Sequence, residues 1–134
     1  MNIYQALGDQ IPWVVQASLL ASALLIAAGF AVRRQIAAAN GGVVPDEGIT
    51  LRNVLEMVVD GLSGLARDTM GEQWRRYFPI VGTIFFFILF SNLLGLVPFL
   101  GGATSDINTT AAWALISFLA YNYVGIETHG FWYL

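Results

Sequence analysis

Two long stretches of the sequence carry no charged residue, and they constrain the fold more than any other feature. The first covers residues 11–32 and the second covers residues 77–105. Each is long enough to cross a hydrocarbon core, which takes about 20 apolar helical residues. Only 11% of all residues are charged, against about one quarter in soluble domains. A chain of 134 residues cannot enclose two such helices in a soluble core, so the pattern predicts an all-α membrane protein.

The charge-free stretches and the turn residues between them predict three transmembrane helices. These lie at about 11–32, 78–99 and 109–126. Pro79 suits the first turn of the second span, and Asp106 precedes the third. Asp9 stands before the first span and Arg33 after it, which reverses the charge order of a cleaved signal peptide. We therefore expect the first span to be retained.

An amphipathic interfacial helix is predicted at about 51–70, with Thr50 as its N-cap. Its apolar stripe recurs at helical spacing and consists of Leu51, Val54, Leu55, Val58, Leu62 and Leu65. The opposite face carries Arg52, Asn53, Glu56, Asp60, Ser63 and Arg67. Because this polar face is mixed in charge, a protein partner or the neighbouring spans explain the helix better than attraction to anionic lipid. An interfacial helix without a partner is the alternative.

The arginines predict how the chain is oriented in the bilayer. All six basic residues are arginines, and all lie between Arg33 and Arg76, in the segment that joins the first two spans. Excess positive charge marks the cytoplasmic side of a membrane. We therefore expect residues 33–76 to be cytoplasmic, the N-terminus and the loop at 101–108 to be outside, and residues 1–134 to form a single membrane domain.

The composition also excludes several kinds of chemistry. Cysteine is absent, histidine occurs once, and the formal net charge is −3. A thiol nucleophile and a Cys or His metal cluster are therefore excluded, and the charge does not favour nucleic acid as a partner. The sequence contains no catalytic triad, phosphate-binding loop or dinucleotide-binding fingerprint. We expect no enzyme active site, no metal and no cofactor.

Three polar residues in or beside the spans are candidate functional residues, because a polar group in lipid is costly. Asn92 lies deep in the second span, where Ser91 and Gly95 form a small-xxx-small pair that lets another helix approach. Two interpretations fit Asn92: a hydrogen bond across that helix contact, or contact with an aqueous half-channel. Asp106 and Asn108 each suit an N-cap of the third span. A carboxylate at an outer vestibule would also attract cations, so the two roles of Asp106 are compatible.

Four motifs in order resemble one protein family. Residues 91–98 read SNLLGLVP and resemble the SNLLGLxP run that ends a transmembrane helix in subunit a of F-type ATP synthases. Residues 104–110, TSDINTT, are similar to the family's TSxxNxT motif before the next helix. Residues 125–130, GIETHG, are similar to its GIxxxG motif, and residues 71–79, GEQWRRYFP, match its approach to the earlier helix. The resemblance covers roughly residues 50–134.

The resemblance implies a non-catalytic stator subunit in the membrane sector of a rotary ATP synthase, in the bacterial inner membrane. Its implied partners are the c-ring, the peripheral stalk subunit b and the lipid bilayer, and its implied role is proton translocation beside the ring. By motif position, Asn92, Asp106 and Asn108 are the implied polar contributors to the outer proton path. The family's essential arginine stands in an R-L-x-x-N setting, which does not occur in this sequence. We therefore expect the chain to be the first half of a longer subunit.

A non-conducting scaffold or anchor subunit of another membrane complex is the alternative function. Its composition would be the same, but it would not need the four motifs in this order. One repeat of a secondary transporter is a further alternative, and it would predict an internal repeat that the sequence does not show.

Overall fold

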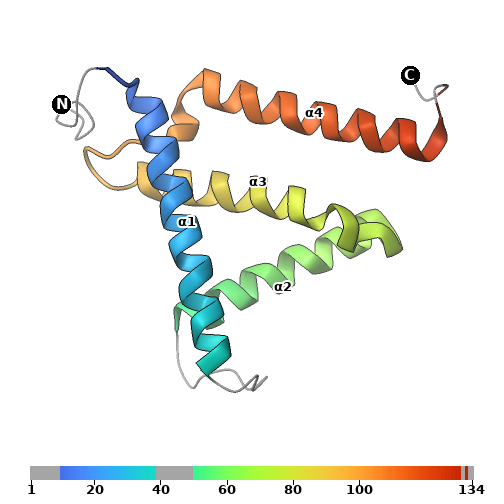
Figure 1. Ribbon diagram of the computed structural model, residues 1–134, viewed down its shortest axis with the longest axis horizontal. Helices are drawn as coiled ribbons and strands as arrows, with labels where there is room; N and C mark the ends of the chain where they lie inside the picture. Colours follow the sequence, from blue (N-terminus) through green and yellow to red (C-terminus); the bar gives the residue numbers. More distant parts are fainter. Residues whose placement is uncertain (1–9, 39–49, 131, 133–134) are drawn as a thin grey trace. The chain divides into compact units, whose positions relative to one another are not determined.

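The computed structural model describes residues 10–38, 50–130 and 132, and the regular secondary structure in these ranges is helical (Figure 1). The α-helices are α1 (Trp13–Ala38), α2 (Leu51–Met70), α3 (Trp74–Gly95) and α4 (Ile107–His129). Two short 3-10 helices, η2 (Gly71–Gln73) and η3 (Ala103–Ser105), precede α3 and α4. The predicted all-α class is confirmed for this part of the chain. Residues 39–49, most of the connector between the first two predicted helices, lie outside the described residues.

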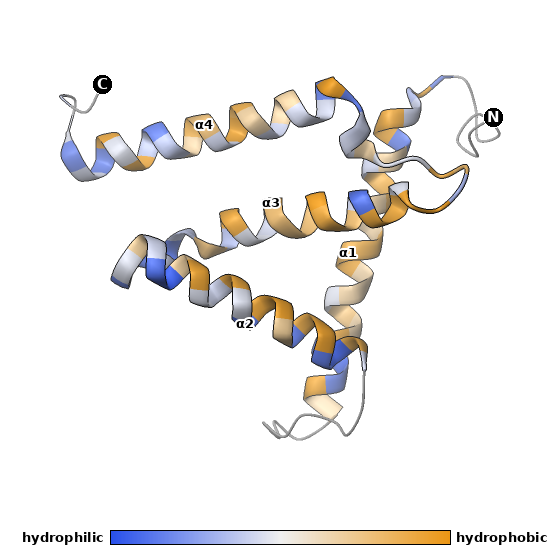
Figure 2. Ribbon diagram, turned by 180° about the vertical axis from the view of Figure 1, so that it is seen from behind, coloured by the Kyte–Doolittle hydropathy of each residue, from blue (hydrophilic) through white to orange (hydrophobic). Residues whose placement is uncertain are grey.

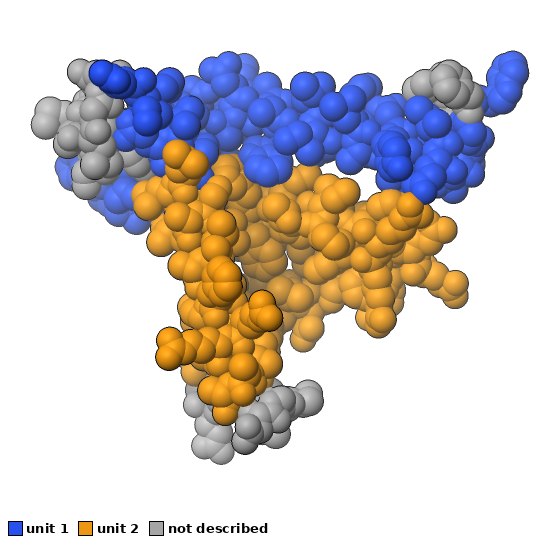
Figure 3. Space-filling model, viewed as in Figure 1, with its two compact units in different colours: residues 1–18, 91–134 blue, residues 19–90 orange. Residues whose placement is uncertain are grey.

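The chain divides into two compact units, which Figure 3 shows in blue and orange. Unit 1 is Met1–Ser18 together with Ser91–Leu134, so it contains the start of α1, the end of α3, η3 and α4. Unit 2 is Leu19–Phe90, which contains the rest of α1, all of α2 and η2, and most of α3. The three candidate residues from the sequence all lie in unit 1.

In the described part of the chain, most buried side chains are small and many large apolar side chains are exposed. The buried apolar residues are Ala17, Ala21, Ala66, Phe87 and Ala103. Along α1, by contrast, Leu19, Ile26 and Phe30 are 62%, 60% and 65% exposed. Figure 2 shows how strongly apolar α1 and α3 are along most of their length. Small residues at contacts and large apolar residues outside are the arrangement expected of helices surrounded by lipid.

Two of the described helical stretches are long and apolar enough to cross a bilayer, namely Trp13–Ala38 and the stretch Leu51–Gly95 that contains α3. Only 11% of the most apolar part of the first stretch is buried within the chain, and 17% of that part of the second. The core helix of a soluble protein would be mostly buried. The third predicted span, at 109–126, lies in α4. α4 is not among the helical stretches that are long and apolar enough to cross a bilayer, because asparagine and threonine side chains lower its mean hydropathy. A third span stays a prediction.

The helix ends differ from the predicted spans for local reasons. α1 continues through Arg33 to Ala38, because arginine and alanine are good helix formers. α3 ends at Gly95 and not near residue 99, because Pro98 disfavours a helical backbone at Val97. α3 also begins earlier than predicted, at Trp74, so Pro79 lies inside the helix and not in its first turn. There its ring nitrogen cannot donate the usual helical hydrogen bond.

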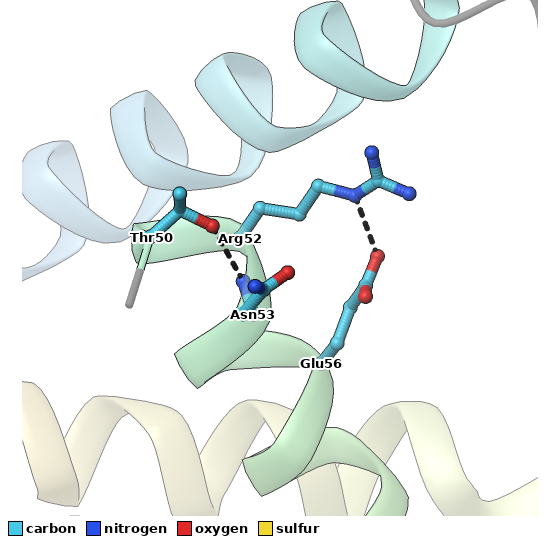
Figure 4. Close-up of polar contacts among 4 residues, drawn as sticks. All are labelled: Thr50, Arg52, Asn53 and Glu56. Carbon is cyan, nitrogen blue, oxygen red and sulfur yellow. Dashed lines mark hydrogen bonds and ion pairs between the residues drawn. The ribbon is translucent and has the colours of Figure 1, made fainter. Parts of the chain in front are cut away.

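α2 covers the residues predicted to form the amphipathic helix, and Thr50 caps it (Figure 4). The Thr50 Oγ1 accepts a hydrogen bond from the Asn53 N–H at 3.2 Å. The buried face differs from the prediction: Arg52, assigned to the polar face, is 4% exposed, whereas Leu65 of the apolar stripe is 64% exposed. The Arg52 Nε donates to the Glu56 Oε1 at 2.8 Å. This ion pair offsets the charge of Arg52, so its aliphatic stem can be buried.

Candidate ion-path site

The candidate site lies in unit 1, where the chain leaves α3 and turns back toward α4. Immediately after α3, the Leu96 N–H donates to the Leu93 carbonyl oxygen at 3.2 Å. Phe99 and Gly101 then adopt left-handed backbone angles, with φ of 72° and 62°. Such residues reverse a chain within a few positions. The reversal returns Gly102 and η3 to the last turn of α3.

Gly102 meets α3 backbone to backbone. A Cβ on Gly102 would lie 2.5 Å from the Ser91 carbonyl oxygen and 3.4 Å from the Gly95 Cα. A Cβ on Gly95 would in turn lie 3.3 Å from the Gly102 nitrogen. Within unit 1, the small pair Ser91 and Gly95 therefore admits the loop that follows α3. The sequence pattern predicts a second helix at this place. It predicts the loop at 101–108 as well, but not that this loop packs against Ser91 and Gly95.

A chain of hydrogen bonds fixes this contact. Ser91 is 0% exposed, and its Oγ accepts from the Thr104 backbone N–H at 3.0 Å. The Thr104 Oγ1 donates to the Asn92 Oδ1 at 2.9 Å. Asn92 itself is exposed on the surface of the chain and lies in the last turn of α3, and its depth in the bilayer stays a prediction. Its amide group has no other hydrogen-bond partner among the described residues.

Asp106 and Asn108 occupy the start of α4. Asp106 is the N-cap, with an extended backbone, and its Oδ1 accepts from the Asn108 backbone N–H at 2.8 Å. Its carbonyl oxygen accepts from the Thr110 N–H at 3.2 Å. Of the two N-cap candidates, the structure thus selects Asp106, and the side chain of Asn108 is exposed. No hydrogen bond among the described residues joins Asn92 to Asp106 or Asn108.

Thr104 is the residue that the sequence does not single out. It belongs to the TSDINTT motif, but its partner Asn92 lies 12 positions earlier, beyond the chain reversal. Trp13 lies at the same end of unit 1, with its Cζ3 3.5 Å from the place where a Cβ of Gly101 would stand. Tryptophan is typical of the boundary between headgroups and hydrocarbon. The loop that carries Thr104 is therefore suited to that boundary.

These features define an α-helical membrane protein whose polar residues gather where an apolar helix ends. The family model described as the ATP synthase A chain matches residues 15–134. The chain belongs to this family, and the membership expected from the four motifs is confirmed.

The curated relatives carry the same family name. ATP synthase subunit a 3 of Pelobacter propionicus is 41% identical over 134 residues, which cover 100% of this chain and 53% of the relative. ATP synthase subunit a of Trichlorobacter lovleyi is 49% identical over 84 residues, which cover 63% of this chain and 36% of the relative. That of Bdellovibrio bacteriovorus is 35% identical over 111 residues, with 83% and 48% covered. The chain spans about half the length of the curated relatives it matches.

Proposed function

We propose that the chain is part of the stator in the membrane sector of an ATP synthase and contributes to proton translocation beside the c-ring. The names of the relatives support the complex, and the two exposed apolar helices support the membrane. The c-ring and the peripheral stalk subunit b are the proposed partners, in the bacterial inner membrane. The N-terminus is outside and residues 33–76 are cytoplasmic. The chain itself carries no catalytic step: its residues orient water and protons.

The orientation of the Asn92 amide carries this proposal. Because Thr104 donates to the amide oxygen, the part of the side chain left to face outward is the NH2 group with its two donors. Leaving such donors unpaired in hydrocarbon costs about 1–3 kcal/mol by mutational data. Water in a half-channel, or an acceptor across it, removes that cost. An exposed, oriented amide on an apolar helix supports the proposal of an aqueous path that begins at this end of α3.

Asp106 and Asn108 contribute at the outer mouth of the same path. The cap bond uses the Oδ1 of Asp106, which leaves the second carboxylate oxygen available to water and cations. The half-buried position of Asp106 keeps that oxygen near the start of α4. A carboxylate so placed raises the local concentration of protons.

Thr104 variants test the amide orientation. Thr104→Val removes the hydroxyl but keeps the shape, so the Asn92 amide is no longer held. We expect ATP-driven proton pumping by vesicles containing the assembled complex to fall roughly twofold to tenfold, the value of one hydrogen bond. Thr104→Ser keeps the hydroxyl and is the matched control, with pumping close to the wild-type rate. Normal pumping by Thr104→Val would show that the orientation has no role.

Asp106 variants separate the cap from the charge. Asp106→Asn keeps an N-cap acceptor and removes the carboxylate, whereas Asp106→Ala removes both. We expect Asp106→Ala to lose about 0.5–2 kcal/mol of stability and Asp106→Asn to lose little. Pumping should fall in both variants, measured beside thermal unfolding of the purified complex. If pumping falls only in Asp106→Ala, the residue is a helix cap and nothing more.

A further inference from the structure

The turn between α2 and α3, in unit 2, gathers guanidinium groups around aromatic rings. The Cζ of Arg67 lies 5.3 Å from the centroid of the Trp74 ring, and the Cζ of Arg75 lies 5.5 Å from the same ring. Both distances are within the range of about 6 Å for a cation–π interaction. Arg76 adds a third guanidinium, 5.7 Å from the centroid of the Tyr77 ring.

The backbone and the packing of the turn hold this cluster in place. Gly71, the C-cap of α2, has a φ of 65°, and its N–H donates to the Arg67 carbonyl oxygen. The chain therefore reverses, and α3 begins at Trp74. Phe78 meets the Trp74 ring edge-on, with centroids 5.5 Å apart and planes at 84°. The Cε1 of Phe78 lies 3.7 Å from the place where a Cβ of Gly82 would stand, so the indole is braced along α3.

In the described ranges of the chain, no carboxylate balances the charge of the two guanidinium groups on the Trp74 ring. Among the residues described, no carboxylate forms an ion pair with Arg67 or Arg75, although Asp68 and Glu72 belong to the same turn. Stacking covers the flat face of a guanidinium and leaves its N–H donors available at the edge. Two positive charges on one ring repel each other, and an anion bound between them turns this repulsion into a net attraction.

We propose that Arg67, Trp74 and Arg75 bind the phosphate group of an anionic phospholipid at the membrane surface. The uncharged run of α3 begins at Tyr77, so the cluster lies where the hydrocarbon gives way to headgroups. The phosphate of a phospholipid offers paired oxygens that match the donor fork of arginine. The two acids of the turn offset most of the diffuse positive field, so recognition rests on the donor forks together with the charge of these two guanidinium groups, which favours an anionic over a zwitterionic headgroup.

The test uses the full-length subunit in its assembled, detergent-solubilised complex, titrated with phosphatidylglycerol or phosphatidylcholine and followed by native mass spectrometry. We expect the double variant Arg67→Gln and Arg75→Gln to bind phosphatidylglycerol roughly tenfold more weakly, with phosphatidylcholine unaffected. The matched control, Arg33→Gln with Arg34→Gln, removes the same charge from α1 and should change binding less than about twofold. Trp74→Leu keeps both charges and should still weaken binding.

Three results would overturn the proposal. Equal losses in the two glutamine double variants would mean that only general charge attracts the lipid. Displacement of phosphatidylglycerol by soluble glycerol phosphate at equal concentration would make the ligand a soluble anion. A double variant with Arg67→Lys and Arg75→Lys keeps both charges and removes the guanidinium forks. Full retention of phosphatidylglycerol by this variant would show that the guanidinium forks are not needed.

Discussion

Replacing Gly102 with alanine is expected to destabilise the subunit severely. The added Cβ would lie 2.5 Å from the Ser91 carbonyl oxygen, and that atom belongs to the backbone of α3, which cannot yield as a side chain can. The loop must therefore move away and break the 3.0 Å hydrogen bond between Ser91 and Thr104. We expect a loss of about 1–3 kcal/mol or more, measured by thermal unfolding of the purified complex and by the amount of subunit in membranes.

Gly61→Ala is the matched control for this substitution. Gly61 lies in the interior of α2, and an added Cβ would meet nothing within 4 Å. Alanine is the better helix former, so this variant should be neutral or more stable by about 0.5–1 kcal/mol. If Gly102→Ala were as stable as Gly61→Ala, the loop would not pack against α3 as described.

Replacing Asn92 with leucine is expected to slow ATP-driven proton pumping about tenfold or more, an increase of about 1.4 kcal/mol or more in the barrier. Leucine has nearly the same size, suits lipid and favours a helix, so the complex should still assemble. The substitution removes the two outward N–H donors of the Asn92 amide. It also removes the amide oxygen, which accepts a hydrogen bond from the Thr104 hydroxyl. The matched control is Leu93→Ile, one residue on, where no polar group changes.

The outcome of that comparison separates the two functions considered for the chain. Slow pumping in Asn92→Leu with normal assembly supports a proton path beside α3. Normal pumping in variants of Asn92, Thr104 and Asp106, with defects confined to assembly, would favour a non-conducting scaffold.

The sequence predicts the helical membrane class well because lipid acts on whole segments. A stretch without charges, such as 11–32, is costly to place anywhere except in hydrocarbon, whatever its neighbours do. The ends of the helices are harder to predict. Pro98 accounts for the end of α3 near Gly95, but the loop that follows reverses through a left-handed Phe99, and no local rule favours that angle for phenylalanine.

At the candidate site, too, contacts between residues close in sequence could be predicted, whereas contacts between distant residues could not. The cap at Asp106 could be predicted, because the acceptor and its donor at Asn108 are two positions apart. The bond from Thr104 to Asn92 could not, since it exists only after the chain has reversed. The burial of Arg52 could not be predicted for a similar reason. Helical spacing assigns this arginine to the polar face, and only packing within the folded chain buries it.

The reactivity of a cysteine at position 92 tests the proposed path most directly. The chain has no cysteine of its own, so Asn92→Cys can be placed in a cysteine-free complex without background. A membrane-impermeant thiol reagent added outside should label Asn92→Cys rapidly and block pumping. Leu93→Cys is the control at the same depth: Leu93 is 51% exposed but lies about 100° further round the helix. It should react slowly. Equal labelling at both positions, or none at position 92 from outside, would contradict an aqueous path along this face of α3.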